Sequence, residues 1–237
     1  MRCPRPARIL PLLLLLAPAM ARAQTADDIV ARSITARGGL ARIKAVTTTR
    51  LTGTIAFGSA APGLFRVTME RGGKSREEVE TPGGMLVRWT DGVHGWIRAP
   101  GDSVTRELTA AELQNMAGST DMDGPFVDAA AKGNRIELIG KDTAEGRPAW
   151  KLRVTGRDSS VRYAWFDADT WLQLKWEGII HGNGRDFDVV SLFSDYRPEH
   201  GIEFARAIDS GPQRIRFTAI EVDVPVPDTL FAAPTGD

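Results

Sequence analysis

Apolar and polar positions alternate along most of the chain from Thr47 onward. In the run LTGTIAF, Leu51 and Ile55 share one face, while Thr52 and Thr54 take the other. The same period of two returns in many later runs, with turn residues between them. Because successive side chains of a β-strand point to opposite faces, this pattern predicts antiparallel strands with one apolar and one polar face.

The apolar rows expected to point inward share this spacing of two. They are Phe65, Val67 and Met69; Met85, Val87 and Trp89; Trp150, Leu152 and Val154; and Leu172, Leu174 and Trp176. The last run differs, because Ile215 and Phe217 lie in phase whereas Ile220 and Val222 are shifted by one residue. One extra residue near Ala219 would produce this shift, so the sequence predicts a β-bulge there.

Helical signals stand before and within the series of strands. The segment of residues 25–45 starts with a capping box, in which Thr25 and Asp28 satisfy each other's backbone N–H groups, and Gly38-Gly39 should bend or break this helix. A second capping box, Thr109 to Glu112, begins a helical insertion expected over about residues 109–133.

The stretch DMDGPFVDAAAKG, residues 121–133, raises the question of a calcium site. A calcium loop needs oxygen ligands at its positions 1, 3, 5 and 9 and a glutamate at 12. Those positions hold Asp121, Asp123, Pro125, Ala129 and Lys132, so three of the five are unsuitable. The sequence instead predicts a short helix that Asp123 caps and Gly133 ends.

About eleven to twelve strand-like runs follow one another without a repeat or linker. The two-sided pattern favours antiparallel meanders, and a long twisted sheet must curl. The predicted fold class is therefore α+β, with helices covering the concave apolar face and a cleft between the two layers.

The N-terminus has the order of a secretory signal peptide. Three arginines precede the apolar run of residues 9–18, and Ala21-Arg22-Ala23 follows it, which predicts cleavage after residue 23. The single domain would then span residues 24–237. Cleavage removes Cys3, the one cysteine, together with four arginines, leaving 26 basic and 30 acidic residues. This balance argues against nucleic acid as a partner.

Signatures of catalysis and of metal binding are mostly missing from the sequence. His94, His181 and His200 stand far apart, and no Gly-x-Ser-x-Gly motif or phosphate-binding glycine loop is present. Asp167 and Asp169 lie between two strong strands, where aspartate usually bonds its own turn. We expect no enzyme, no cofactor and no metal.

Arg206 is harder to explain, because it interrupts the apolar row of Ile202, Phe204 and Ile208. It could reach water at the rim or pair with an acid there. Alternatively, it could receive the anionic group of a ligand whose apolar part fills the cavity. The six tryptophans, most of them on strands, could line such a cavity or simply pack the core.

The succession of several segments resembles outer-membrane lipoprotein-sorting (LolA/LolB-like) proteins, in a divergent branch. The segments are ARSITARGGLARIKAVTTTRLTG, DGVHGWI, DMDGPFVDAAAKGNRIELIGKD, RYAWFDADTWLQLKWE, FSDYRPEHGIEFARAID and VPVPDTLF. The resemblance spans roughly residues 27–234. It implies an incomplete, half-open antiparallel β-barrel of about 11–12 strands, lined with apolar side chains and closed by helices.

The resemblance and the expected cleft together predict a soluble periplasmic carrier or chaperone without a lipid anchor. It would bind acyl chains of lipoproteins or other lipids, with envelope membrane proteins as donor or acceptor. An envelope sensor of the same fold that binds a protein partner is the alternative, and an unrecognised hydrolase is a further one. The residues expected to line the cavity are Leu51, Ile55, Phe65, Val67, Trp89, Leu152, Val154, Leu174, Trp176, Phe204, Arg206 and Phe217.

Overall fold

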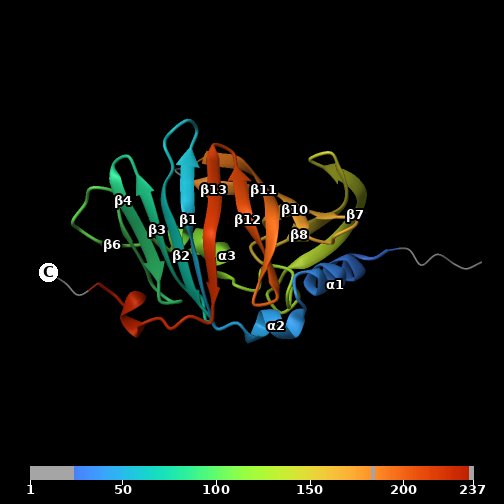
Figure 1. Ribbon diagram of the computed structural model, residues 1–237, viewed down its shortest axis with the longest axis horizontal. Coiled ribbons are helices and arrows are strands. Elements are labelled where there is room, and N and C mark those ends of the chain that lie inside the picture. The colour runs from blue at the N-terminus through green and yellow to red at the C-terminus, as the bar shows by residue number, and fades with distance from the viewer. Residues whose placement is uncertain (1–23, 183–184, 235–237) are drawn as a thin grey trace, which may run out of the picture.

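The computed structural model describes residues 24–182 and 185–234 (Figure 1), so the predicted signal peptide lies outside the described residues. The helices are α1 (Ala26–Ala36), α2 (Leu40–Ala45), α3 (Ala110–Thr120) and the 3₁₀ turn η1 (Asp228–Leu230). Both capping boxes form, Thr25 with Asp28 and Thr109 with Glu112. Helix α1 ends at the predicted glycine pair. None of the described helices has the length and apolar character needed to cross a membrane.

The described strands number thirteen and form one antiparallel sheet, confirming the half-open barrel with slightly more strands than expected. The first six are β1 (Thr48–Phe57), β2 (Gly63–Glu70), β3 (Lys74–Thr81), β4 (Gly84–Thr90), β5 (Gly95–Arg98) and β6 (Arg106–Glu107). The others are β7 (Arg135–Ala144), β8 (Arg147–Thr155), β9 (Val161–Asp167), β10 (Gln173–Gly182), β11 (Arg185–Glu199), β12 (Ile202–Ser210) and β13 (Gln213–Val222).

The strand order is β6-β5-β4-β3-β2-β1-β13-β12-β11-β10-β9-β8-β7, so β1 meets β13 in the middle while β6 and β7 are the two edges. Every pairing except β1 with β13 joins strands that are consecutive in the chain. The sheet therefore consists of two meanders of neighbouring strands, joined along one central seam. Figure 1 shows this arrangement, with α3 behind β1 and β13 and with α1 beside the β7 end.

The strand register defines two faces of the sheet. The inner face carries Leu51, which pairs with Val67 on one side and Ile220 on the other. Its apolar cluster near the seam is built from Ile55, Phe65, Val79, Phe217 and Ile220. A second cluster on the same face, near the β7 end, comprises Ile29 of α1 with Phe126, Leu152, Val154, Ala164 and Phe166. Helix α1 therefore covers the inner face, as the amphipathic pattern predicted.

The predicted β-bulge is confirmed in β13. Thr52 pairs with Ala219 but Gly53 pairs with Phe217, which leaves Thr218 as the extra residue. Because of this shift, Phe217 and Ile220 both reach the inner cluster although three positions separate them. The hydrophobic phase slip in the sequence thus has a direct structural cause.

Strands β12 and β13 separate beyond the bulge, since their pairing runs only from Ala207 with Arg216 to Ser210 with Gln213. The junction between α1 and α2 lies at the separated part of β12. The backbone N–H of Glu203 donates to the carbonyl of Arg37 over 3.0 Å. Gly38, at φ 119°, approaches Gly201 so closely that a Cβ atom would lie 2.2 Å from its carbonyl oxygen. Glycine is therefore required at position 38.

The predicted helix over residues 123–133 is wrong. Residues 121–134, here called the covering segment, form consecutive turns after α3 ends. Asp128 and Gly124 have positive φ angles, and the side chain of Asp123 bonds to Arg71 instead of capping a helix. Capping rules describe local preferences, and here a contact with a distant arginine overrides them.

Candidate ligand-binding site

A small cavity of about 190 Å³ lies on the inner face, beside the place where β12 and β13 separate. Most of its wall is apolar, and Arg37 and Thr49 are its polar members. The lining residues come from the α1–α2 region, from β1, β2 and β12, and from the covering segment: Arg37, Ile43, Val46, Thr49, Leu51, Met69, Met122, Ile202 and Phe204. The cavity thus touches every layer that closes the inner face at the seam.

The covering segment contributes two apolar side chains to the inner face. Met122 packs against Val46, Ile202 and Val222. Phe126 packs edge to face on Phe166, with ring centroids 5.0 Å apart, and on Trp176 at 5.9 Å. One short segment thereby occupies both halves of the concave side, and it would have to move before anything larger could enter.

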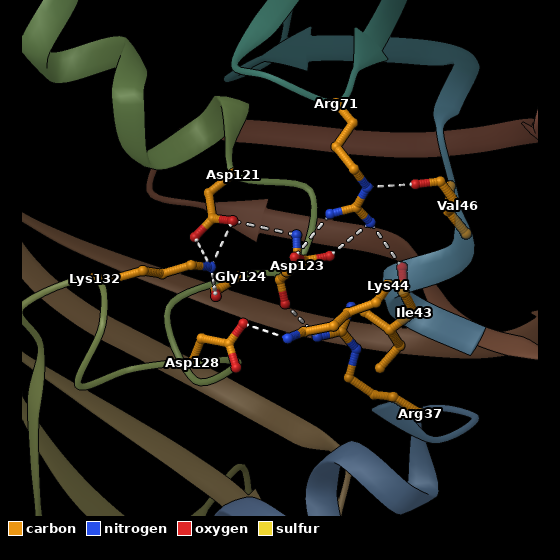
Figure 2. A network of polar contacts seen from close by, with 10 residues as sticks. All are labelled: Arg37, Ile43, Lys44, Val46, Arg71, Asp121, Asp123, Gly124, Asp128 and Lys132. Atoms are coloured by element: carbon orange, nitrogen blue, oxygen red, sulfur yellow. Dashed lines mark hydrogen bonds and ion pairs between the residues drawn. The ribbon is translucent and has the colours of Figure 1, made fainter. Parts of the chain in front are cut away.

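Polar contacts hold the covering segment in this position, as Figure 2 shows. The guanidinium of Arg71, at the end of β2, donates to both carboxylate oxygens of Asp123 over 2.9 and 3.0 Å. Two further N–H groups donate to the carbonyls of Val46 and Ile43 over 2.7 and 2.9 Å. Arg71 therefore joins the covering segment to the C-terminal end of α2.

Three further cations complete the network (Figure 2). Lys132 donates to Asp121 over 2.6 Å and to the carbonyl of Gly124 over 2.8 Å, which closes the segment on itself. Lys44 of α2 lies 2.5 Å from Asp128, and Arg37 donates to the carbonyl of Asp123 over 3.1 Å. Asp121 and Asp123, which stand at the first two ligand positions of a calcium loop, are therefore paired with cations of the protein.

Several groups in and near the network have shifted pKa values. Burial opposes ionisation of Asp123, but the hydrogen bonds and charge of Arg71, helped by Lys132 and Lys44, outweigh it and hold its pKa below the ordinary value. Burial lowers the pKa of the Arg37 guanidinium. Burial also raises the pKa of Tyr196, whose hydroxyl donates to the carbonyl of Gln173 over 2.8 Å. Asp123 thus stays ionised, and the pair holds, down to acidic pH.

The structure brings most of the predicted lining residues to the inner face, in two groups. The group near the cavity contains Leu51, Ile55, Phe65, Val67, Phe204 and Phe217. The group near α1 contains Leu152, Val154 and Trp176, which pack with Ile29 and Phe126. The second group is closed by protein side chains, and in the first group Leu51 and Phe204 are the members that line the cavity.

Trp89 and Leu174 lie on the outer face, contrary to the expected inward rows. Trp89 pairs with Arg76 and packs with Val87 and Trp96, while its indole N–H donates to the carbonyl of Ala232 over 2.9 Å. The C-terminal segment therefore covers an apolar patch on the outer face, which the alternation had assigned to the inner face.

Leu174 changes face because β10 is irregular between Gln173 and Lys175. It packs there with Ala144, Ala149 and Trp165. Lys175 and Lys151 lie 4.5 Å from the Trp165 ring and shield it from water.

Arg206 has two protein partners. It is paired with Glu199 and donates to the carbonyl of Thr218, the extra residue of the bulge, over 3.1 Å. Its side chain is 15% exposed. The interpretation in which Arg206 pairs with an acid therefore agrees with its contact with Glu199 of β11, while its contact with Thr218 bridges the gap between β12 and β13.

The sequence did not indicate the roles of Arg37, Arg71 and Met122, which contribute most to the closure of the inner face by the covering segment. Arg71 stands beside a Gly-Gly turn and Arg37 at the end of a helix, where solvated arginines are common. Met122 lies between two acids and outside any periodic run. Only contacts between distant segments reveal their roles.

No protein-family model matches this sequence. No curated protein matches it either. Solved structures do match. A DUF1329 family protein from Desulfovibrio piger is similar with a TM-score of 0.59 and 13% identity, over 87% of this chain and 97% of that chain.

Two further structures match nearly as much of the chain. A LolA superfamily protein from Nitrosomonas europaea has a TM-score of 0.58 and 15% identity, over 89% of this chain and 99% of that one. A protein described as a putative outer membrane lipoprotein-sorting protein domain, from Vibrio parahaemolyticus, has a TM-score of 0.59 and 13% identity, over 87% of this chain and 97% of that chain. The chain therefore has the LolA-like fold, in agreement with the predicted resemblance.

Proposed function

We propose that this protein is a periplasmic carrier that binds acyl chains of lipoproteins or other lipids on its inner face, without catalysis. The observation that carries this proposal is the apolar cavity beside Leu51 and Phe204, closed by a segment that polar contacts hold in place. The likeness in fold to lipoprotein-sorting proteins supports the same class of ligand.

The cavity must enlarge before an acyl chain can bind. Its volume of about 190 Å³ is below the about 300–1,000 Å³ that small-molecule pockets usually have. Displacing Met122 and Phe126 would join the two inner clusters into one apolar surface. Each buried methylene contributes about 0.8 kcal/mol, so a long chain could offset the loss of the packing that it replaces.

The contacts of the covering segment define an order of events for such a carrier. Its contacts with Arg71, Lys44 and Arg37 keep the inner face closed when no ligand is present. These contacts are polar and partly exposed to water, so they can be exchanged for water at modest cost. An acyl chain that inserts under the segment would then expose Asp123 and bury its own tail.

The proposal is tested by expressing the full chain with its N-terminal leader in a bacterial envelope and purifying it without detergent. A native mass spectrum followed by organic extraction should show an added mass that extracts as a lipid or lipopeptide. Bare protein that takes up no envelope lipid would contradict the carrier. A protein that co-purifies in place of lipid would favour the sensor.

A matched pair of variants connects binding to the cavity. Leu51→Gln places an amide in the inner cluster and should abolish uptake of a fluorescent fatty acid. Val93→Gln makes the same kind of change at a side chain that is 69% exposed, and uptake should be unchanged. Equal uptake by both variants would place the binding site elsewhere.

A further inference from the structure

A second and larger pocket, of about 440 Å³, lies on the outer face of the sheet, opposite the apolar cavity. It is formed by β1, β2, β3 and β13 with the C-terminal segment, which contributes Pro227 and Leu230. Polar and charged side chains line the rest: Arg50, Thr52, Arg66, Thr68, Arg76, Glu78 and Glu221. The proposed carrier function makes no use of this site.

Strand register places the arginines next to one another. In one cross-strand row, Thr68 lies between Arg50 and Arg76, and in the next row Arg66 lies between Thr52 and Glu78. Side chains directly opposite each other in such rows are about 5 Å apart at Cβ. Three guanidinium groups therefore share one small area of a rigid sheet.

The two glutamates of the pocket accept hydrogen bonds from only some of the N–H donors of its arginines. Glu78 accepts from Arg66 over 3.0 Å and from the Nε of Arg76 over 3.2 Å. Glu221 comes no nearer than 3.8 Å to Arg50, beyond hydrogen-bond distance. A guanidinium has five N–H donors. Within the described chain, the contacts thus occupy one donor each on Arg66 and Arg76 and none on Arg50.

The charges and shape of the pocket favour a compact anion. Three arginines and two glutamates give a positive excess of one charge. Thr68 stands between Arg50 and Arg76, and Thr52 lies opposite Arg66. Guanidinium groups bind phosphate oxygens in pairs of parallel hydrogen bonds. We propose that this outer pocket binds a phosphate group, held by Arg50 and Arg66 with Thr52 and Thr68.

The test uses inorganic phosphate and vesicles of phosphatidylglycerol as separate probes of the full chain. Calorimetry and amide NMR should show saturable phosphate binding, with shifts confined to β1, β2 and β3. Arg50→Gln should weaken this binding by about tenfold, as expected for losing a hydrogen bond to a charged group. Arg135→Gln removes the same charge from a 66% exposed side chain on β7 and should change nothing.

A variant with the opposite effect separates recognition from simple damage to the fold. Glu221→Gln removes the carboxylate nearest to Arg50 and should strengthen phosphate binding several-fold, which no loss of stability would do. The vesicle titration identifies the source of the phosphate. Suppose that vesicles bind, that Arg50→Gln weakens and Glu221→Gln strengthens this binding, and that free phosphate does not bind. The phosphate group would then be assigned to a lipid headgroup.

Two results would overturn the proposal. One is the absence of saturable binding to both probes in the millimolar range. The other is binding that responds to Arg135→Gln as strongly as to Arg50→Gln, since this would indicate a general charge effect. Neither result bears on the acyl-chain cavity, because that cavity lies on the opposite face.

Discussion

Arg71 and Asp123 are 52 positions apart in the chain, yet both carboxylate oxygens of Asp123 accept hydrogen bonds from the Arg71 guanidinium, over 2.9 and 3.0 Å. The Asp123 side chain is only 12% exposed, whereas that of Arg71 is 36% exposed. Removing the arginine would therefore leave a largely buried carboxylate without its main partner, a change that acts directly on the covering segment.

We expect Arg71→Gln to lower the free energy of unfolding by roughly 1–2 kcal/mol, the range for losing a partly exposed charged hydrogen bond. Amide exchange should accelerate across residues 121–134 while the central strands stay protected. Urea titration and hydrogen exchange measure both quantities. Arg71→Lys keeps the charge without the planar fork and should recover part of the loss. Unchanged exchange in this segment would show that its other contacts, such as the packing of Phe126, hold it without Arg71.

The pair of Arg71 and Asp123 should hold the covering segment in place only above a limiting acidic pH. The pKa of Asp123 lies below its ordinary 3.8, because the interactions with Arg71 outweigh the opposing effect of burial. A lowered carboxyl pKa stabilises the folded state above the unfolded-state pKa, and this stability is lost as the pH falls through the folded pKa. Exchange of residues 121–134 should therefore accelerate below about pH 4. Asp123→Asn should remove that dependence, and a profile unchanged by the substitution would contradict the assignment.

Glu112 in α3 should also stay ionised in acid. Its hydrogen bonds to Arg106, followed by those to Thr109, lower its pKa to about 2. The capping contact should therefore persist until the pH falls to about 2. Carboxyl NMR shifts from pH 6 to pH 2 would follow this group, and titration near its ordinary pKa of 4.5 would contradict the assignment.

Leu152 and Leu51 should respond differently to truncation, because one is closed by protein and the other borders the cavity. Leu152 is fully buried, so Leu152→Ala should cost about 2–5 kcal/mol of stability. Leu51→Ala enlarges a cavity that already exists and should cost less, while changing fatty-acid uptake more. Denaturation and uptake measured on both variants test this, and the reverse order would show that the ligand enters near α1.

Arg206→Leu should reduce stability without distinguishing between ligands. The substitution removes Arg206 as the partner of Glu199 in β11 and of the Thr218 carbonyl at the gap between β12 and β13. Binding of an anionic and of a neutral lipid should then fall by the same factor. A loss confined to the anionic lipid would instead support a contact between Arg206 and the ligand headgroup.

The junction of α1 and α2 allows a controlled comparison of two glycines. A Cβ at Gly38 would lie 2.2 Å from the carbonyl oxygen of Gly201, whereas nothing lies within 4 Å of a Cβ at Gly58. Both have positive φ angles, so each alanine carries backbone strain of about 1–2 kcal/mol. Gly38→Ala should show a further loss in thermal melting, and equal losses would mean that the junction can shift away from β12.

The sequence correctly predicted the elements whose structure depends on interactions between residues close together in the chain. Both capping boxes formed because their partners are three residues apart. The shift in alternation between Phe217 and Ile220 revealed the bulge because this alternation depends on residues within a single strand. The α+β class followed from the same alternation.

The alternation assigned Trp89 to the wrong face, because β4 has apolar side chains on both. Leu86 packs toward the inner cluster, while Val87 packs with Trp89 on the outer face, where the Trp89 indole donates to the carbonyl of Ala232. The covering segment failed as a helix for a related reason, since Arg71, Lys44 and Arg37 determine its course from other parts of the chain. Contacts between distant segments decided both cases.

The order of strands gives the covering segment a mechanical role. Strands β6 and β7 are the two free edges of the sheet, and the chain passes from one to the other only through α3 and residues 121–134. This stretch is therefore a strap across the open side of the half-barrel. A ligand that moves the two edges apart also moves this connecting stretch, so the distance between β6 and β7 and the contact between Arg71 and Asp123 cannot change independently.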